Sequence, residues 1–93
     1  MSLRLPPEKY APLKQAVFVR DQWRCRYCRV RQNLHIHHIT YRSHGGEDAM
    51  YNLVTLCMQC HEAVHSGNLI VEWSTYLGAG TVRFYPNNGW RPQ

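Results

Sequence analysis

Four cysteines in this 93-residue sequence form two pairs, and each pair has the spacing of a metal-binding knuckle. The pairs are Cys25-x-x-Cys28 and Cys57-x-x-Cys60. Two intervening residues let both thiolates of a pair bind one ion, and two pairs fill the four positions of tetrahedral zinc. Because four thiolates leave no position for water or substrate, we expect a structural Zn²⁺. Disulfides, an iron–sulfur site and free thiols are the alternatives.

Histidines are concentrated between the two cysteine pairs and directly after the second pair. His37 and His38 are adjacent, whereas His61 and His65 are four residues apart. On a helix the second spacing places both rings on one face, where they can bind one ion. On a strand, adjacent side chains point to opposite sides, so one histidine of the first pair can bind an ion while the other faces water or substrate. Two or three imidazoles leave open positions on a metal, which is typical of a catalytic site.

The periodicity of the sequence predicts the elements that must position these residues. Apolar residues recur at helical spacing near the N-terminus, and short runs of β-branched and aromatic residues lie between turn signals. The expected elements are a helix from Glu8 to Gln22, a strand from Leu34 to Tyr41, a loop at Gly45-Gly46, a strand from Asn52 to Leu56, a helix from Met58 to His65 ending at Ser66-Gly67, and a hairpin of Leu69 to Trp73 with Thr81 to Tyr85 around Gly78 to Gly80.

Taken together, these motifs resemble the HNH endonuclease family. The resemblance rests on two knuckles that enclose His37-His38, a Gly-Gly loop and Asn52, and on the closing Cys60-His61. It covers about Val17 to Ser66 and leaves the flanks 1–16 and 67–93 without an assignment. It implies one HNH nuclease domain over residues 1–93. The implied fold is small α+β: a ββα-metal (His-Me finger) core with zinc knuckles, an N-terminal helix and a C-terminal β-hairpin.

The resemblance also implies a role for each residue of the motif. His37 and His61 would bind a catalytic ion, with His65 as a third ligand. His38 would be the general base, for which an imidazole with a pKa near neutrality is suited. Asn52 would orient His38 across the hairpin loop. The implied reaction is one-metal hydrolysis of DNA, as nicking or double-strand cutting, with Mg²⁺ or Mn²⁺ expected and Ni²⁺, Co²⁺ or Zn²⁺ compatible with imidazole ligands.

The distribution of charge favours a polyanionic partner. The formal net charge is +5, and eight of the eleven Lys and Arg residues lie within residues 1–31. Phosphate contacts dominate affinity for nucleic acid, although a solvated basic face would explain the charge equally well. We expect double-stranded DNA bound with little intrinsic sequence specificity, and both a homodimer and a larger partner protein stay open. The candidate DNA contacts are Arg24, Arg26, Arg29, Arg31 and Arg42.

Two other functions fit parts of the sequence. A non-catalytic zinc module that binds DNA explains the cysteines and the charge but leaves the histidines incidental. The stretch from His61 to His65 also matches the H-E-x-x-H motif of zinc proteases, with Glu62 as base. The protease hypothesis leaves His37-His38 unexplained and finds few third ligands downstream. We find no secretory signal or membrane span, so a cytoplasmic protein without membrane association is expected.

Overall fold

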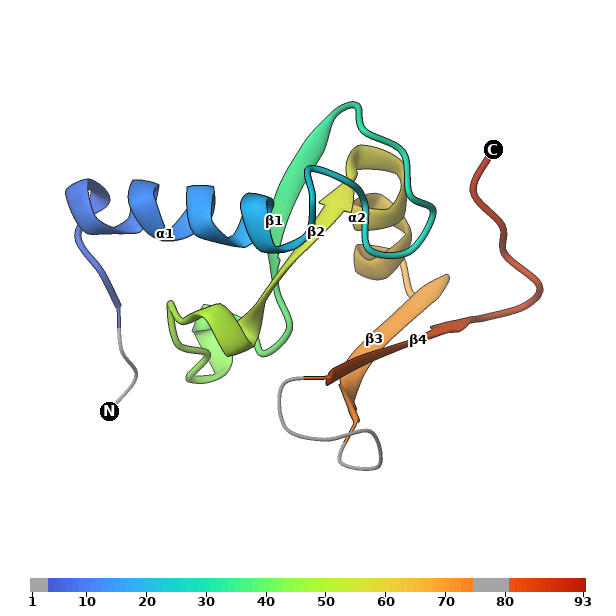
Figure 1. The fold of residues 1–93 in the computed structure, drawn as a ribbon. Coiled ribbons are helices and arrows are strands. Elements are labelled where there is room, and N and C mark those ends of the chain that lie inside the picture. Colours follow the sequence, from blue (N-terminus) through green and yellow to red (C-terminus); the bar gives the residue numbers. More distant parts are fainter. Residues whose placement is uncertain (1–3, 75–80) are drawn as a thin grey trace.

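The computed structural model describes residues 4–74 and 81–93. It has a small α+β architecture with two helices and two antiparallel two-stranded sheets (Figure 1). Two short 3-10 turns, Arg42–His44 and Met50–Asn52, lie between the first two strands. The other elements are α1 (Pro7–Arg20), β1 (Leu34–His38), β2 (Leu53–Cys57), α2 (Met58–His65), β3 (Leu69–Ser74) and β4 (Thr81–Pro86). Within the described residues, no helix is both long and apolar enough to span a membrane.

Strand β2 lies at the centre of the molecule. All five of its residues are buried, because α1 and α2 both pack against it (Figure 1). It pairs antiparallel with β1, in a register that places Leu34 opposite Cys57 and His38 opposite Leu53. The cysteine end of β2 therefore lies beside the start of β1, and the other end lies beside His38.

The N-terminal helix ends two residues earlier than the sequence predicts. α1 stops at Arg20 rather than Gln22, because Gln22 and Trp23 have φ of 60° and 53° and turn the chain towards the first knuckle. Asp21 holds this turn in place. Its buried carboxylate accepts hydrogen bonds from Arg20 Nε at 2.8 Å, from Arg26 at 2.9 Å and from the backbone amide of Thr55 at 3.0 Å. One side chain thus joins the helix, the knuckle and β2.

The strand expected from Leu34 to Tyr41 also ends early, at His38. The chain then leaves the ladder and forms the turn at Arg42–His44, in which Gly46 donates a backbone hydrogen bond to Tyr41 at 2.8 Å. The approach is so close that a Cβ on Gly46 would lie 1.8 Å from the carbonyl oxygen of Thr40. The second strand begins one residue later than predicted, because Asn52 belongs to a 3-10 turn.

The second half of the chain follows the predictions closely. α2 spans Met58–His65 as expected, and Gly67 follows its cap at Ser66 with a φ of 84°. The C-terminal hairpin is confirmed by the pairing of β3 with β4, in a register that includes Val71 opposite Phe84. The turn predicted at Gly78 to Gly80 lies outside the described residues.

The hydrophobic core is small and is built around the cysteines. Tyr27, from the first knuckle, packs against Phe84 of β4 and Trp90, with ring centroids 5.4 Å and 6.2 Å away. The C-terminal hairpin and tail therefore cover the knuckle region. The buried residues of this core are Cys25, Val54, Leu56, Cys57, Cys60, Ala63 and Leu69.

Candidate metal centres

The four cysteines converge on one point, as the knuckle spacing predicts. Their Sγ atoms all lie within 4.8 Å of one another, and Cys28 Sγ lies 3.5 Å from Cys57 Sγ. All four are free thiols, and three of them, Cys25, Cys57 and Cys60, are buried. Zn–S bonds of about 2.3 Å place tetrahedral ligands roughly 3.8 Å apart. The cluster therefore suits a zinc ion.

The four thiols would need a cation in order to ionise together. Backbone amides of Cys28 and Cys60 point at Cys25 Sγ and Cys57 Sγ, at 3.5 Å and 3.4 Å, as in a metal knuckle. Even so, burial raises the pKa of Cys28 to about 11, and burial also raises the pKa of Cys60. Several thiolates cannot form together in so small a volume without a positive ion to neutralise them. Because the cluster joins the first knuckle to the start of α2, that ion would hold the fold together.

Three histidines form a second cluster. The ligand nitrogens of His37, His61 and His65 lie within 4.8 Å of one another, and the Nε2 atoms of His61 and His65 are 3.1 Å apart. β1 supplies the first ring, which is only 2 % exposed, and one face of α2 supplies the other two. Burial, reinforced by the two neighbouring imidazoles, lowers the pKa of His37 to about 4. The ring is therefore neutral near pH 7, with a lone pair available for a metal.

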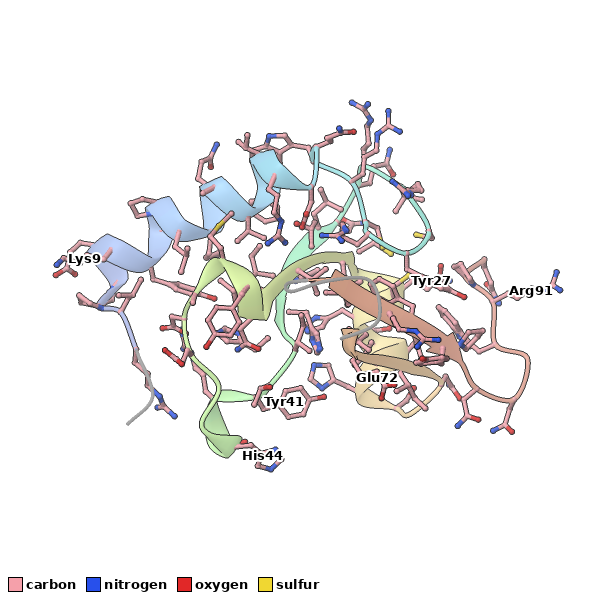
Figure 2. All side chains as sticks on the ribbon, turned by 60° about the horizontal axis from the view of Figure 1, so that its bottom comes forward. Lys9, Tyr27, Tyr41, His44, Glu72 and Arg91 are labelled. Atoms are coloured by element: carbon pink, nitrogen blue, oxygen red, sulfur yellow. The ribbon has the colours of Figure 1, made fainter. Side chains whose placement is uncertain are left out.

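A pocket of about 220 Å³ opens beside this cluster. Tyr41 forms one side: its ring stacks on His65 with centroids 5.8 Å apart and meets His37 edge-on. His44 stacks on the outer side of Tyr41 (Figure 2). His35 is exposed and stacks on His61 at 5.5 Å, on the side of β1 that bears His37. The lining residues are Ile36, His37, His38, Tyr41, Arg42, His61 and His65.

His38 lines the same pocket, and its position is set by a residue that sequence reasoning did not single out. Its Nε2 lies 2.8 Å from Oδ1 of Asp48, whose carboxylate is buried. Arg42 donates to both oxygens of the same carboxylate, at 2.9 Å each. The sequence shows only two acidic residues, Glu47 and Asp48, after the Gly45-Gly46 loop, and it does not reveal the partner of Asp48, which lies ten residues away.

Asn52 contacts the loop rather than the ring of His38. Its side chain accepts a hydrogen bond from the amide of Thr40 at 2.8 Å and donates to the carbonyls of Thr40 and Glu47, at 3.0 Å and 2.9 Å. Its own carbonyl accepts from Ile39 at 2.9 Å. These bonds hold the backbone that follows His38, and the role of Asn52 in orienting His38 stays a prediction.

The five candidate DNA contacts have different surroundings. Arg26 is paired with Asp21, and Arg42 is paired with Asp48. Arg24 is half-buried, and its Nε has no hydrogen-bond partner among the described residues. Arg29 and Arg31 are exposed on the knuckle side of the molecule. Arg29 also lines a second, wider pocket of about 380 Å³ with Arg20, Asp21, Gln22 and Arg26.

The residues of the H-E-x-x-H alternative are also placed by the structure. His61 and His65 cluster with a third histidine, His37, rather than with a downstream acid. Glu62 is exposed on α2, and Glu72 lies on β3 with an exposed side chain (Figure 2). The histidine cluster thus includes His37, which the protease hypothesis leaves unexplained.

A comparison with protein-family models finds the same family that the cysteine and histidine motifs resemble. Residues 25–67 match the family model described as HNH endonuclease. The chain is also similar to Anaredoxin from Nostoc sp. (strain PCC 7120 / SAG 25.82 / UTEX 2576), with 28% identity over 67 residues, covering 71% of this chain and 88% of that protein. No solved structure matches the chain. An HNH domain indicates a nuclease or another nucleic-acid-binding role.

Proposed function

We propose that the protein is an endonuclease that hydrolyses DNA phosphodiester bonds with one catalytic cation and His38 as general base. The observation that supports this best is the pocket of about 220 Å³, which is lined both by the three clustered imidazoles and by His38. The HNH match supports the same class of protein. We interpret the consecutive elements β1, β2 and α2 as its ββα-metal core.

The donor set fits a transition-metal ion. Metal–nitrogen bonds of about 2.1 Å place imidazole nitrogens roughly 3 to 3.5 Å apart, and His61 and His65 already have this spacing, at 3.1 Å. Neutral imidazoles favour Mn²⁺, Co²⁺, Ni²⁺ or Zn²⁺, whereas Mg²⁺ prefers oxygen ligands. His37, His61 and His65 would hold the ion. Bound there, it would supply positive charge to the phosphate and to the leaving oxygen as negative charge develops.

The remaining chemistry belongs to the side chains of the pocket. His38 takes a proton from a water molecule, whose oxygen attacks the phosphorus in line with the leaving group. The new P–O bond forms as the bond to the 3′ oxygen breaks, and solvent protonates that oxygen. The products are 5′-phosphate and 3′-hydroxyl ends. Arg42, whose side chain is 43 % exposed, directs its remaining N–H groups to the substrate phosphate.

DNA binding would extend beyond the pocket. Arg29 and Arg31 are exposed at the knuckle, near the start of β1, whereas His38 ends that strand. Five strand residues span roughly 13 to 17 Å, the distance of several nucleotides along one DNA strand. Contacts to phosphates at this distance suit duplex DNA with little sequence specificity, since the phosphates carry no sequence information.

Nicking of supercoiled plasmid tests the proposal. The zinc-loaded protein is incubated with Mn²⁺, Ni²⁺ or Mg²⁺, and the wild type is compared with His38→Ala and with Glu62→Gln. We expect metal-dependent nicking that falls by about 10²- to 10⁴-fold in His38→Ala and is unchanged in Glu62→Gln, because Glu62 lies outside the pocket.

Two outcomes would contradict the proposal. If Glu62→Gln abolishes activity and His38→Ala does not, the H-E-x-x-H alternative is favoured. If no metal supports nicking although the protein contains one zinc and retards DNA in a gel, the chain is a zinc module that binds DNA without cutting it. Metal analysis of the purified protein distinguishes zinc from iron at the cysteine cluster.

A further inference from the structure

Asp48 is the most completely satisfied side chain near the pocket. Its carboxylate is fully buried, yet four hydrogen bonds from three separate segments reach it. His38 Nε2 at 2.8 Å and Arg42 Nε at 2.9 Å contact Oδ1. A second Arg42 nitrogen at 2.9 Å and the backbone amide of Leu5 at 3.0 Å contact Oδ2. Buried carboxylates are costly unless they are paired in this way.

The hydrogen bonds decide the ionisation state of Asp48. Burial alone would raise its pKa, but the hydrogen bonds from Arg42, Leu5 and His38 together lower the pKa to about 2. The group is therefore an anion near neutral pH. An ionised carboxylate only accepts hydrogen bonds, so the proton between it and His38 must be on Nε2. In the neutral imidazole the lone pair is then on Nδ1, the nitrogen that can act as a base.

The N-terminal segment completes this arrangement. Besides the amide of Leu5, the ring of Tyr10 stacks against His38, with centroids 6.2 Å apart and an angle of 17° between the planes. The Arg42 guanidinium lies 4.8 Å from the centre of the same ring. Arg4 donates to the carbonyl oxygen of Arg42 at 2.8 Å. Residues 4–10, which precede the segment matched by the HNH family model, thus contact both His38 and the groups that hold it.

We propose that Asp48 is the positioning residue of the general base: it fixes the His38 imidazole with its proton on Nε2 and leaves Nδ1 to accept a proton from water. This inference rests on the proposed role of His38. Asp48 itself is enclosed and does not touch substrate, so it acts through the side chains that it holds, His38 and Arg42. The Asp48 carboxylate is held by Arg42 and by the amide of Leu5, and the His38 ring is held by Tyr10. The N-terminal flank is therefore part of the catalytic site.

Two measurements test the inference. The first is ¹⁵N NMR of the imidazoles in the zinc-loaded protein, with the His38 signals assigned by their loss in His38→Ala. We expect a proton on Nε2 in the wild type and a shift of the tautomer population in Asp48→Asn. The wild-type spectrum needs no variant at all, so the inference stays testable even if Asp48→Asn folds poorly.

The second measurement is steady-state nicking by Asp48→Asn. We expect kcat to fall by about 10- to 10³-fold, because the base is misoriented. Glu47→Gln is the matched control: it makes the same chemical change one residue away, on a side chain that bonds Tyr51 and leaves the pocket untouched. We expect it to cut at the wild-type rate.

The outcomes separate this inference from the proposed function. A wild type that nicks DNA with His38 protonated on Nδ1, or an Asp48→Asn variant that retains the wild-type kcat, overturns the role of Asp48 and leaves the nuclease standing. A wild type that fails to nick DNA with every metal tested overturns the nuclease, and the role of Asp48 falls with it, whatever the tautomer of His38.

Discussion

Asn52 pairs with the backbone of Thr40 in both directions: it accepts from the Thr40 amide at 2.8 Å and donates to the Thr40 carbonyl at 3.0 Å. Thr40 is two residues past His38, and Asn52 directly precedes β2. The amide group therefore extends the β1–β2 pairing beyond the last ladder residues and closes the loop that contains Asp48.

Removal of this pairing is expected to weaken both the fold and the activity. Asn52→Ala leaves the half-buried backbone groups of Thr40 and Glu47 without the Asn52 amide as a partner, at a cost of about 1–3 kcal/mol in the free energy of unfolding. Asn52→Asp should be worse, since its carboxylate would face two carbonyl oxygens. Urea unfolding measures both variants. Asn68→Ala, which removes an exposed hydrogen bond, should change stability by under about 0.5 kcal/mol. Equal effects of Asn52→Ala and Asn68→Ala on stability would contradict the role of Asn52.

Gly46→Ala is expected to distort the same loop. The new Cβ would lie 1.8 Å from the Thr40 carbonyl oxygen, so the backbone must move and the Asn52 pairing must open. Gly67→Ala is the natural comparison, because nothing lies within 4 Å of its Cβ and only its φ of +84° is unfavourable, at a cost of about 1 kcal/mol. Thermal unfolding should show the larger drop in Tm for Gly46→Ala. The reverse order would mean that the loop accommodates a side chain freely.

Two adjacent substitutions distinguish the two metal clusters. Cys60→Ser removes a buried ligand of the cysteine cluster, so we expect loss of zinc and of the cooperative unfolding transition, as in other small domains stabilised by zinc. His61→Ala removes a ligand of the histidine cluster and should keep one zinc and the fold while losing nicking. Zinc content and circular dichroism measure both effects. A folded Cys60→Ser variant without zinc would show that the ion is dispensable.

The pKa of Asp48 predicts the direction of a pH effect. The folded-state pKa of about 2 lies below the ordinary value of 3.8, so the unfolded chain binds the proton more tightly. The stabilisation by Asp48 is therefore complete above about pH 5 and is lost as the pH falls towards 2. The difference in unfolding free energy between the wild type and Asp48→Asn should narrow over that window. Protonation of the thiols affects both proteins alike, so a difference that is constant with pH would contradict the assignment.

The arginines should separate into two groups in DNA-binding assays. Arg29 and Arg31 are exposed, so Arg29→Ala or Arg31→Ala should weaken binding and reduce the slope of log K against log salt by about 0.9 for each phosphate that the variant no longer neutralises. Arg26→Ala breaks the ion pair with Asp21 and should mainly lower stability. Fluorescence anisotropy at several salt concentrations measures the slope. An unchanged slope for both exposed arginines would place the DNA elsewhere.

The parts of the fold that could be predicted are those set by local pattern. The end of α2 follows from its cap at Ser66-Gly67, and the two knuckles follow from spacing alone. The ends of β1 and β2 differ from the prediction because Asn52 uses its side chain, rather than a regular ladder, to bond Thr40. No short stretch of sequence reveals the bond between Asn52 and Thr40, since the two residues are twelve positions apart.

Contacts between residues far apart in the sequence also limited the prediction of the candidate site. His37, His61 and His65 could be grouped because a strand and a helix each impose a fixed side-chain direction, although their roles stay predictions. Asp48 could not be assigned, because its significance comes from Arg42, His38 and the distant amide of Leu5. The ion pair of Arg26 could not be predicted for a similar reason: its partner, Asp21, becomes its neighbour only when the helix ends.

The positions of the two knuckles have a consequence for the folding of the β1–β2 hairpin. They bracket the 28 residues between Cys28 and Cys57, so a zinc ion that joins them closes the hairpin into a covalently anchored ring. By the chain-entropy relation used for disulfides, closing a ring of this size disfavours the unfolded chain by about 3–4 kcal/mol. Loss of the zinc ion would open the ring without altering any histidine. The clustered histidines would then no longer be held in one arrangement, although each would remain chemically intact.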